Sequence, residues 1–171
     1  MENFSTNAER SGKVYFARFP NVGERSCDRY CLRHSVLGYS WTGLRTGHDT
    51  IDVARTEAKL FWPDGRRGAN PTLTCFKEIN ESGGLILLKS NGSYYLGVAT
   101  GEFQSNSAHS DAGIDHHIRV QYYGIPENRI PWSVRSVRLR RLIQPRYDEE
   151  LVAAVWEIFY EYADASCVVN P

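Results

Sequence analysis

The feature that most constrains the fold is the stretch from Gly84 to Phe103, which predicts a β-hairpin. Two apolar arms flank the pair Asn91-Gly92, and both residues tolerate the positive φ angles of a type I′ turn. The second arm ends in Gly97-x-x-x-Gly101, where missing side chains permit a bulge or the close approach of another strand. A hairpin that closes tightly and then curls favours a small barrel, and small barrels often bind ligands at their mouths.

Length and charge suit one folded domain without a global electrostatic bias. The chain has 171 residues, enough for a substantial core, and its 20 basic and 20 acidic residues cancel. A uniformly basic nucleic-acid-binding protein is therefore excluded. The arginines are nevertheless concentrated in one segment, which several acidic residues follow: Arg129, Arg135, Arg138, Arg140, Arg141 and Arg146. A local basic strip can exist inside a neutral protein.

The sequence carries no predicted membrane segment. There is no apolar run near the ~20 residues that a transmembrane helix needs, and the first residues lack a signal-peptide core. The cysteines have no disulfide-framework spacing, which favours reduced thiols: Cys27, Cys31, Cys75 and Cys167. We therefore expect a cytoplasmic protein with no membrane partner.

The order of predicted elements indicates an α+β fold. We expect strands over residues 14–19, 35–41, 117–123 and 134–143, and helices over 24–33, 52–59 and 72–80. Residues 62–71 predict a turn and 104–115 a polar loop. This order fits a small twisted barrel-like mixed sheet with surrounding helices and a C-terminal amphipathic helix. Residues 1–12 predict a disordered lead-in, 13–145 a binding domain, and 146–165 a helix that packs on the domain or extends it.

No complete catalytic or metal-binding set is present in the sequence. Cys27-x-x-x-Cys31-x-x-His34 offers three zinc ligands where four are usual, and two buried helical cysteines explain it better. Asp115-His116-His117 resembles a phosphoesterase signature, but the further motifs of that family are missing. Nuclease, serine-hydrolase, Walker and dinucleotide motifs are also missing. We expect a binding module with no catalytic residue, no metal and no cofactor.

Aromatic residues at predicted loops and strand ends are the positive evidence for binding. Tyr39 and Trp41 lie at a strand exit, Trp62 lies in a turn and Phe103 follows the hairpin. A base that is flipped out of a nucleic acid needs flat apolar walls and a few polar groups that recognise its edge. At each of these positions, the simpler explanation is that the aromatic ring belongs to the hydrophobic core and does not bind a base.

The order of short motifs resembles the PUA-like superfamily, in particular the EVE and YTH-like domains of Mrr-like and McrB-like modification-dependent restriction proteins. The resemblance covers roughly residues 13–143 and is carried by four segments, 14–18, 36–41, 96–103 and 116–122, followed by an Ile-Pro. Two departures are Gly83-Gly84 in place of the usual Gly-Asp, and Tyr122 in place of the usual Trp. Each motif alone is weak, and their order carries the resemblance.

The resemblance implies a DNA-binding reader that flips a modified, methylated base into an aromatic pocket, in prokaryotic defence. Carried over by position, the base pocket comprises Tyr39, Ser40, Trp41, Trp62, Asp64, Asn70 and Phe103. The expected contacts to the nucleic-acid backbone are Arg18, Arg45, Arg66, Arg67, His116, His117 and Arg119.

Two alternatives and one partner question stay open at this point. A PUA-like domain for RNA or a modified nucleotide needs fewer phosphate contacts than a duplex reader. A metal-dependent nuclease would use the polar segment His109, Asp111, Asp115, His116 and His117. The C-terminal helix is a candidate for docking an effector nuclease or NTPase, or for forming a homodimer.

Overall fold

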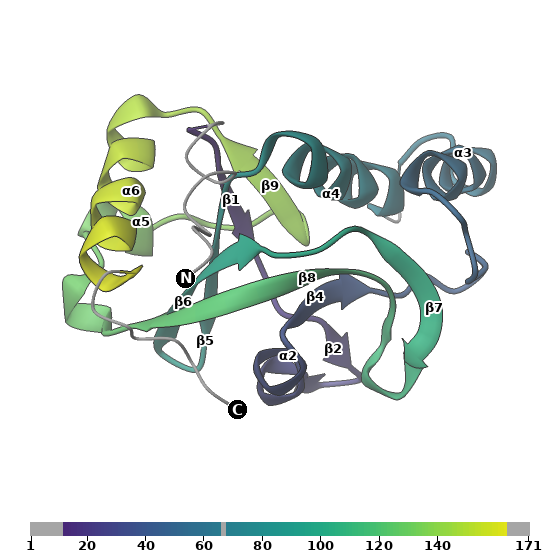
Figure 1. Cartoon of the computed structure of the whole chain (residues 1–171), viewed down its shortest axis with the longest axis horizontal. Helices are drawn as coiled ribbons and strands as arrows, with labels where there is room; N and C mark the ends of the chain where they lie inside the picture. The colour runs from purple at the N-terminus through teal and green to yellow at the C-terminus, as the bar shows by residue number, and fades with distance from the viewer. Residues whose placement is uncertain (1–11, 66–67, 164–171) are drawn as a thin grey trace.

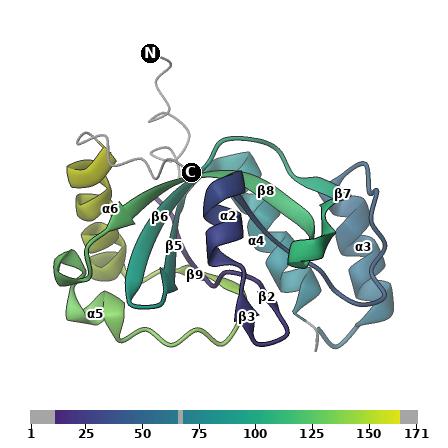
Figure 2. The ribbon, with the colours of Figure 1, turned by 90° about the horizontal axis from the view of Figure 1, so that it is seen from below.

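A curled mixed sheet organises the chain in the computed structural model, which describes residues 12–65 and 68–163 (Figures 1 and 2). Its strand order is β4-β8-β6-β5-β1-β9, and β7 pairs with β8 outside this path. β1 and β5 pair in parallel, whereas the other pairs are antiparallel. The strands of this sheet are β1 (Val14–Ala17), β4 (Val36–Tyr39), β5 (Leu85–Ser90), β6 (Ser93–Ala99), β7 (Gln104–His109), β8 (Ile114–Ile125) and β9 (Ile143–Arg146).

Helices surround the sheet, and a small hairpin precedes the first of them. Figure 1 shows α5 and α6 together at one end of the sheet and α3 and α4 at the other. The helices are α2 (Asp28–His34), α3 (Ile51–Phe61), α4 (Ala69–Ser82), α5 (Trp132–Arg135) and α6 (Glu149–Ala163). The short elements are the strands β2 (Asn21–Val22) and β3 (Arg25–Ser26) and the 3₁₀ turns η1 (Ser110–Ala112) and η2 (Glu127–Arg129). The prediction of an α+β fold with a curled mixed sheet is confirmed.

The predicted hairpin is present as β5 and β6. Asn91 and Gly92 have φ angles of 48° and 80°, as a type I′ turn requires. A Cβ atom on Gly97 would lie 2.6 Å from Cγ1 of Val120, so the glycine lets β8 approach β6. The close approach predicted for this glycine is confirmed.

Alternate residues of the central strands fill two cores, one on each face of the sheet. In β1, Val14 and Phe16 join the core beneath α6, whereas Tyr15 and Ala17 join the core with α4. Strands buried on both faces lose the apolar–polar alternation, which explains the continuous apolar run of β5. α6 begins with Glu149 and Glu150 and packs its apolar side on this sheet.

Four local predictions were wrong. Residues 25 and 26 belong to the predicted helix over 24–33 but form β3, because Gly23, with a φ angle of 60°, turns the chain back so that β3 pairs with β2. Helix α4 begins at Ala69 inside the predicted turn, because the first helical turn tolerates Pro71. Residues 104–109 form β7 rather than a loop, because pairing with β8 supplies the hydrogen bonds that the polar sequence does not reveal. Residues 136–142 lie outside strands and helices, because Val137 and Leu139 pack on the sheet without pairing with it. Apolar residues and arginines alternate in this segment as they would in a strand, which explains the wrong prediction.

Some predictions concern residues outside those that the structure describes. Residues 1–11, 66–67 and 164–171 lie outside the described residues, and with them most of the predicted lead-in, the end of the predicted terminal helix and Cys167. Among the described helices, none has the length and apolar character required to cross a bilayer.

Candidate functional site

The first half of β8 lies between two strands and places adjacent histidines on opposite faces of the sheet. His116 is opposite Tyr39 of β4 and Ser105 of β7, and His117 is opposite Gly38 and Gln104. A Cβ atom on Gly38 would lie 2.3 Å from the carbonyl oxygen of His116, so only glycine fits there. Because successive side chains of a strand alternate, each histidine belongs to a separate cluster.

The His116 cluster comprises His116, Trp41, Phe103 and His48. The His116 ring lies 5.7 Å from Trp41, 6.2 Å from Phe103 and 5.5 Å from His48, between ring centroids. Its Nε2 lies 3.0 Å from the Arg45 carbonyl oxygen, which can only accept, so Nε2 carries a proton. Burial, and then the proximity of His48, lowers the pKa of His116. This ring is therefore neutral at physiological pH.

A polar network holds the His116 cluster in place. Nε and Nη2 of Arg45 donate to the two carboxylate oxygens of Glu57, each over 3.2 Å, and His48 Nε2 lies 2.7 Å from Glu57 Oε2. Hydrogen bonds from Arg45 first, and from His48 second, lower the pKa of Glu57 to about 2. Glu57 is therefore ionised, and it fixes the segment from Arg45 to His48 against α3.

Ser105, His48 and Glu57 form a hydrogen-bonded serine–histidine–carboxylate series, and the serine in it is buried. Its Oγ lies 3.1 Å from His48 Nδ1 and accepts a hydrogen bond from the His48 backbone N–H over 3.2 Å. The side chain of His48 is 5% exposed, and Ser105 is also buried. We assign Ser105 to joining the segment around His48 to β7.

The second cluster lies on the opposite face and comprises Tyr30, His34, His109 and His117. Tyr30 Oη lies 2.8 Å from His109 Nδ1, and the rings of His109 and His117 are 4.9 Å apart. Burial is the main cause that lowers the pKa of His117 to about 4. Burial, and then the proximity of His34, lowers the pKa of His109 as well. Both histidines are therefore largely neutral at physiological pH.

The motifs weighed for catalysis do not assemble in the structure. His116 and His117 face opposite sides, and Asp115 accepts a hydrogen bond from Ser110. Cys31 is buried, which raises the pKa of its thiol. Throughout residues 12–65 and 68–163, no group of three or more His, Cys, Asp or Glu side chains is arranged to hold a metal ion.

An open cleft brings together three of the residues predicted from sequence. It has a volume of ≈ 280 Å³ and lies where β1 and β4 end. Its lining residues are Arg18, Phe19, Pro20, Asn21, Tyr39, Ser40, Gly113 and Leu142. The Tyr39 hydroxyl lies in hydrogen-bond reach of the Arg18 and Leu142 carbonyl oxygens, and Ser40 Oγ accepts from the Asp115 N–H over 2.9 Å. These bonds hold the walls of the cleft together.

The other predicted pocket residues lie behind or beside this cleft. Trp41 is only 8% exposed and packs 6.1 Å from Tyr39, between ring centroids. Trp62 and Phe103 are half-buried and pack against the same core. Asp64 is exposed in the turn after α3, whereas Asn70 lies in the first turn of α4, and its buried Oδ1 has no hydrogen-bond partner among the described residues. The structure thus forms two groups, Arg18–Tyr39–Ser40 and Trp41–Phe103–His116.

The residues predicted to contact the nucleic-acid backbone differ in solvent exposure. Arg18 and Arg119 are exposed, and Arg45 is exposed but bound to Glu57. His116 and His117 are 0% and 1% exposed, so neither offers a surface to a phosphate. Their prediction as phosphate contacts is corrected, because other side chains cover both faces of β8: Trp41 and Phe103 pack against the His116 ring, and His109 packs against the His117 ring. Arg66 and Arg67 lie outside the described residues.

Sequence reasoning missed the residues of the polar network. His48, Glu57 and Ser105 are far apart in the chain and form no motif. One signal was available, because Glu57 lies beside Ala54 and Ala58 on the buried side of α3. A carboxylate on a buried helix face predicts a cationic or hydrogen-bonding partner.

Comparison with known proteins adds no relative to this description. No protein-family model, no curated protein and no solved structure matches the chain. The PUA-like resemblance therefore remains a prediction from the sequence.

Proposed function

We propose that this chain is a nucleic-acid-binding reader that recognises a modified base in the open cleft where β1 and β4 end, here called the reader cleft. The observation that carries the proposal is the cleft itself, with a volume of ≈ 280 Å³. That volume is near the lower end of pockets for small organic ligands, about 300 Å³, and suits a single flipped base. Three residues that the sequence predicts for the site line it: Arg18, Tyr39 and Ser40.

The chemistry of the lining supports recognition of a base edge. Phe19, Pro20 and Leu142 supply apolar wall, while Arg18, Asn21 and Ser40 supply polar groups. An arginine and an asparagine side chain provide the donor and acceptor pairs that distinguish bases. The Ser40 hydroxyl accepts from Asp115 and retains its own proton for donation.

The aromatic residues take a supporting role in this proposal. The sequence predicts stacking of the base on Trp41, with Trp62 or Phe103. Because Trp41 is buried behind Tyr39, we assign it to stiffening the cleft wall. A methyl group in contact with apolar wall contributes about 0.8 kcal/mol, which gives less than tenfold discrimination. Hydrogen bonds from Arg18 and Asn21 would supply the rest.

Fluorescence anisotropy with matched oligonucleotides tests the proposal. The set comprises DNA and RNA, single- and double-stranded, each with an unmodified, a methylated or a hydroxymethylated base. We expect tighter binding to one modified base, and equal affinity for all members would overturn base reading. Preference for the RNA members would move the proposal to an RNA reader.

Paired variants locate the recognition. Asn21→Ala should reduce the preference for the modified base, because Asn21 lines the reader cleft. Asn128→Ala is the matched control, since this asparagine is also exposed but lies in the 3₁₀ turn η2. An unchanged preference in Asn21→Ala would place the base elsewhere.

A further inference from the structure

The segment of residues 135–142, here called the connector, presents arginines to solvent along its whole length. Val137 and Leu139 turn inward onto the sheet, whereas the arginines between and beside them are exposed: Arg135, Arg138, Arg140 and Arg141. Within the part of the chain that the structure describes, no carboxylate lies at ion-pair distance from these four side chains. Their charge is therefore available to an anionic partner.

The connector leads to the reader cleft. Its first part covers the ends of β1 and β5, where Arg135, Val137 and Leu139 line a small cavity with Phe16 and Ala17. Its last residue, Leu142, lines the reader cleft and accepts a hydrogen bond from the Arg18 backbone N–H over 2.9 Å. The four arginines thus form a basic track between the cavity and the cleft.

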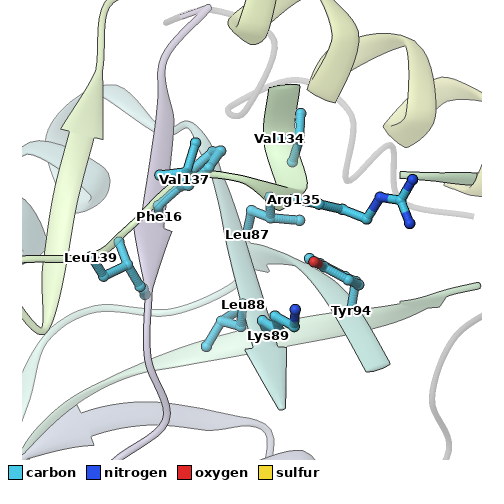
Figure 3. A pocket seen from close by; sticks show the side chains of 10 residues that line it. Phe16, Leu87, Leu88, Lys89, Tyr94, Val134, Arg135, Val137 and Leu139 are labelled. Carbon is cyan, nitrogen blue, oxygen red and sulfur yellow. The ribbon is translucent and has the colours of Figure 1, made fainter. Parts of the chain in front are cut away.

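The small cavity holds a buried donor that lacks a partner. Its volume is ≈ 40 Å³, and Figure 3 shows the Tyr94 hydroxyl directed toward Leu87 and Arg135 at its edge. No group among the described residues hydrogen-bonds this hydroxyl, although Tyr94 is 2% exposed. Lys89 Nζ lies 5.1 Å from the centre of the Tyr94 ring. A buried hydroxyl beside a lysine suits an anionic oxygen.

An exposed aromatic ring stands at the start of the track. Trp132 is 74% exposed, and the Arg135 guanidinium carbon lies 5.9 Å from the centre of its ring. Proteins that bind single-stranded nucleic acid combine basic tracks with such aromatic rings, on which bases stack. An acidic protein partner would not need the ring, and a lipid surface would not account for a track that leads to the reader cleft.

We infer that the connector binds the phosphodiester backbone of a single strand, an inference that rests on the proposed reader function. Arg138, Arg140 and Arg141 contact successive phosphates, and one phosphate oxygen enters the cavity to accept a hydrogen bond from Tyr94. Trp132 stacks an unpaired base at the far end of the track. The strand then passes Arg18 into the reader cleft.

Charge-matched triple variants test the track. In Arg138→Gln/Arg140→Gln/Arg141→Gln we expect about tenfold weaker binding of every single-stranded oligonucleotide, and a shallower salt dependence, with the slope of log K against log[salt] reduced by about 2. The control Arg25→Gln/Arg29→Gln/Arg33→Gln removes the same charge from exposed positions on β3 and α2. Equal losses in both variants would overturn the track, because only diffuse electrostatics would remain.

The same titrations separate this inference from the proposed function. If binding depends on the connector but modified and unmodified bases bind equally, base reading fails and the track stands. If the preference for a modified base persists and the triple variant binds normally, the track fails and the reader stands. Tighter binding of an acidic peptide or of anionic vesicles than of the oligonucleotide would overturn the choice of partner.

Tyr94→Phe tests the cavity without changing charge. Because the hydroxyl has no partner among the described residues, its removal should leave the melting temperature unchanged or slightly raised. Binding should weaken about tenfold, since a hydrogen bond to a charged oxygen is lost. Unchanged binding would show that the cavity holds only water, and would overturn the role of Tyr94.

Discussion

Two regions of the molecule present exposed arginines, and they use them in opposite ways. In the first region, the side chain of Arg45 is 82% exposed, yet its guanidinium forms a bidentate ion pair with Glu57. This ion pair supports the His116 cluster. In the second, the connector arginines have no acidic partner among the described residues. An exposed charge is therefore not automatically a binding charge, and partner geometry separates structural arginines from those available for phosphate.

The two regions also differ in their backbone structure. The first region consists of paired strands and a helix, with β8 held between β4 and β7. The second is an irregular segment anchored by Val137 and Leu139. Substitutions should therefore affect folding in the first region and binding in the second.

The largest expected effect is on the paired region. Gly38→Ala places a Cβ atom 2.3 Å from the His116 carbonyl oxygen and 2.4 Å from His117 Cβ, which forces β4 away from β8. We expect a loss of about 3 kcal/mol in unfolding free energy, measured by urea denaturation. Gly101→Ala is the control, because its Cβ would meet only the Arg119 side chain at 3.3 Å. Equal costs would contradict the register of β4.

The next effect concerns the Arg45–Glu57 ion pair. Glu57→Gln should lower the unfolding free energy by about 1.5 kcal/mol at pH 7, because charge-assisted hydrogen bonds are lost. Since the folded pKa lies at about 2 and the ordinary value is 4.5, this stabilisation is complete above pH 4.5. It should disappear as the pH falls toward 2, so the stability curves of the two proteins converge. A difference independent of pH would show that Glu57 stabilises through packing.

A further effect, which acts at higher pH than that of Glu57, comes from His117. Its pKa is lowered from 6.5 to about 4, so the unfolded chain binds a proton more readily than the folded one. Stability is therefore fully present above pH 6.5 and declines as the pH falls toward 4. NMR titration of the His117 ring should show a midpoint near 4. A midpoint near 6.5 would mean that the ring is accessible to water.

The smallest expected effect on folding is that of the connector triple variant. Arg138→Gln/Arg140→Gln/Arg141→Gln removes exposed charges without ion-pair partners among the described residues, so its unfolding free energy should stay within about 0.5 kcal/mol of the native value. Thermal denaturation checks this. A large loss would place these arginines with Arg45 as structural residues and remove the contrast between the two regions.

The sequence predicted local structure where the chemistry is local. Asn91-Gly92 defined the hairpin turn, and the spacing of apolar residues defined α6. It failed where distant pairing decides, because the polar segment 104–109 becomes a strand only beside β8. The structure brings together in one cleft Arg18, predicted as a backbone contact, and Tyr39 and Ser40, predicted for the base pocket, because β1 and β4 both end there. The Glu57 network was missed because its members meet only in three dimensions.

The most direct test of the account is a double-mutant cycle that combines Asn21→Ala with the connector triple variant. Affinities of the four proteins for one modified and one unmodified single strand would be measured at the same salt concentration. We predict that Asn21→Ala lowers the modified-to-unmodified ratio, that the triple variant lowers both affinities equally, and that the effects add. The account would be contradicted if the wild-type protein bound the modified and unmodified strands equally. It would also be contradicted if the connector variant changed the ratio of the two affinities, because base recognition and backbone binding would then not be separate.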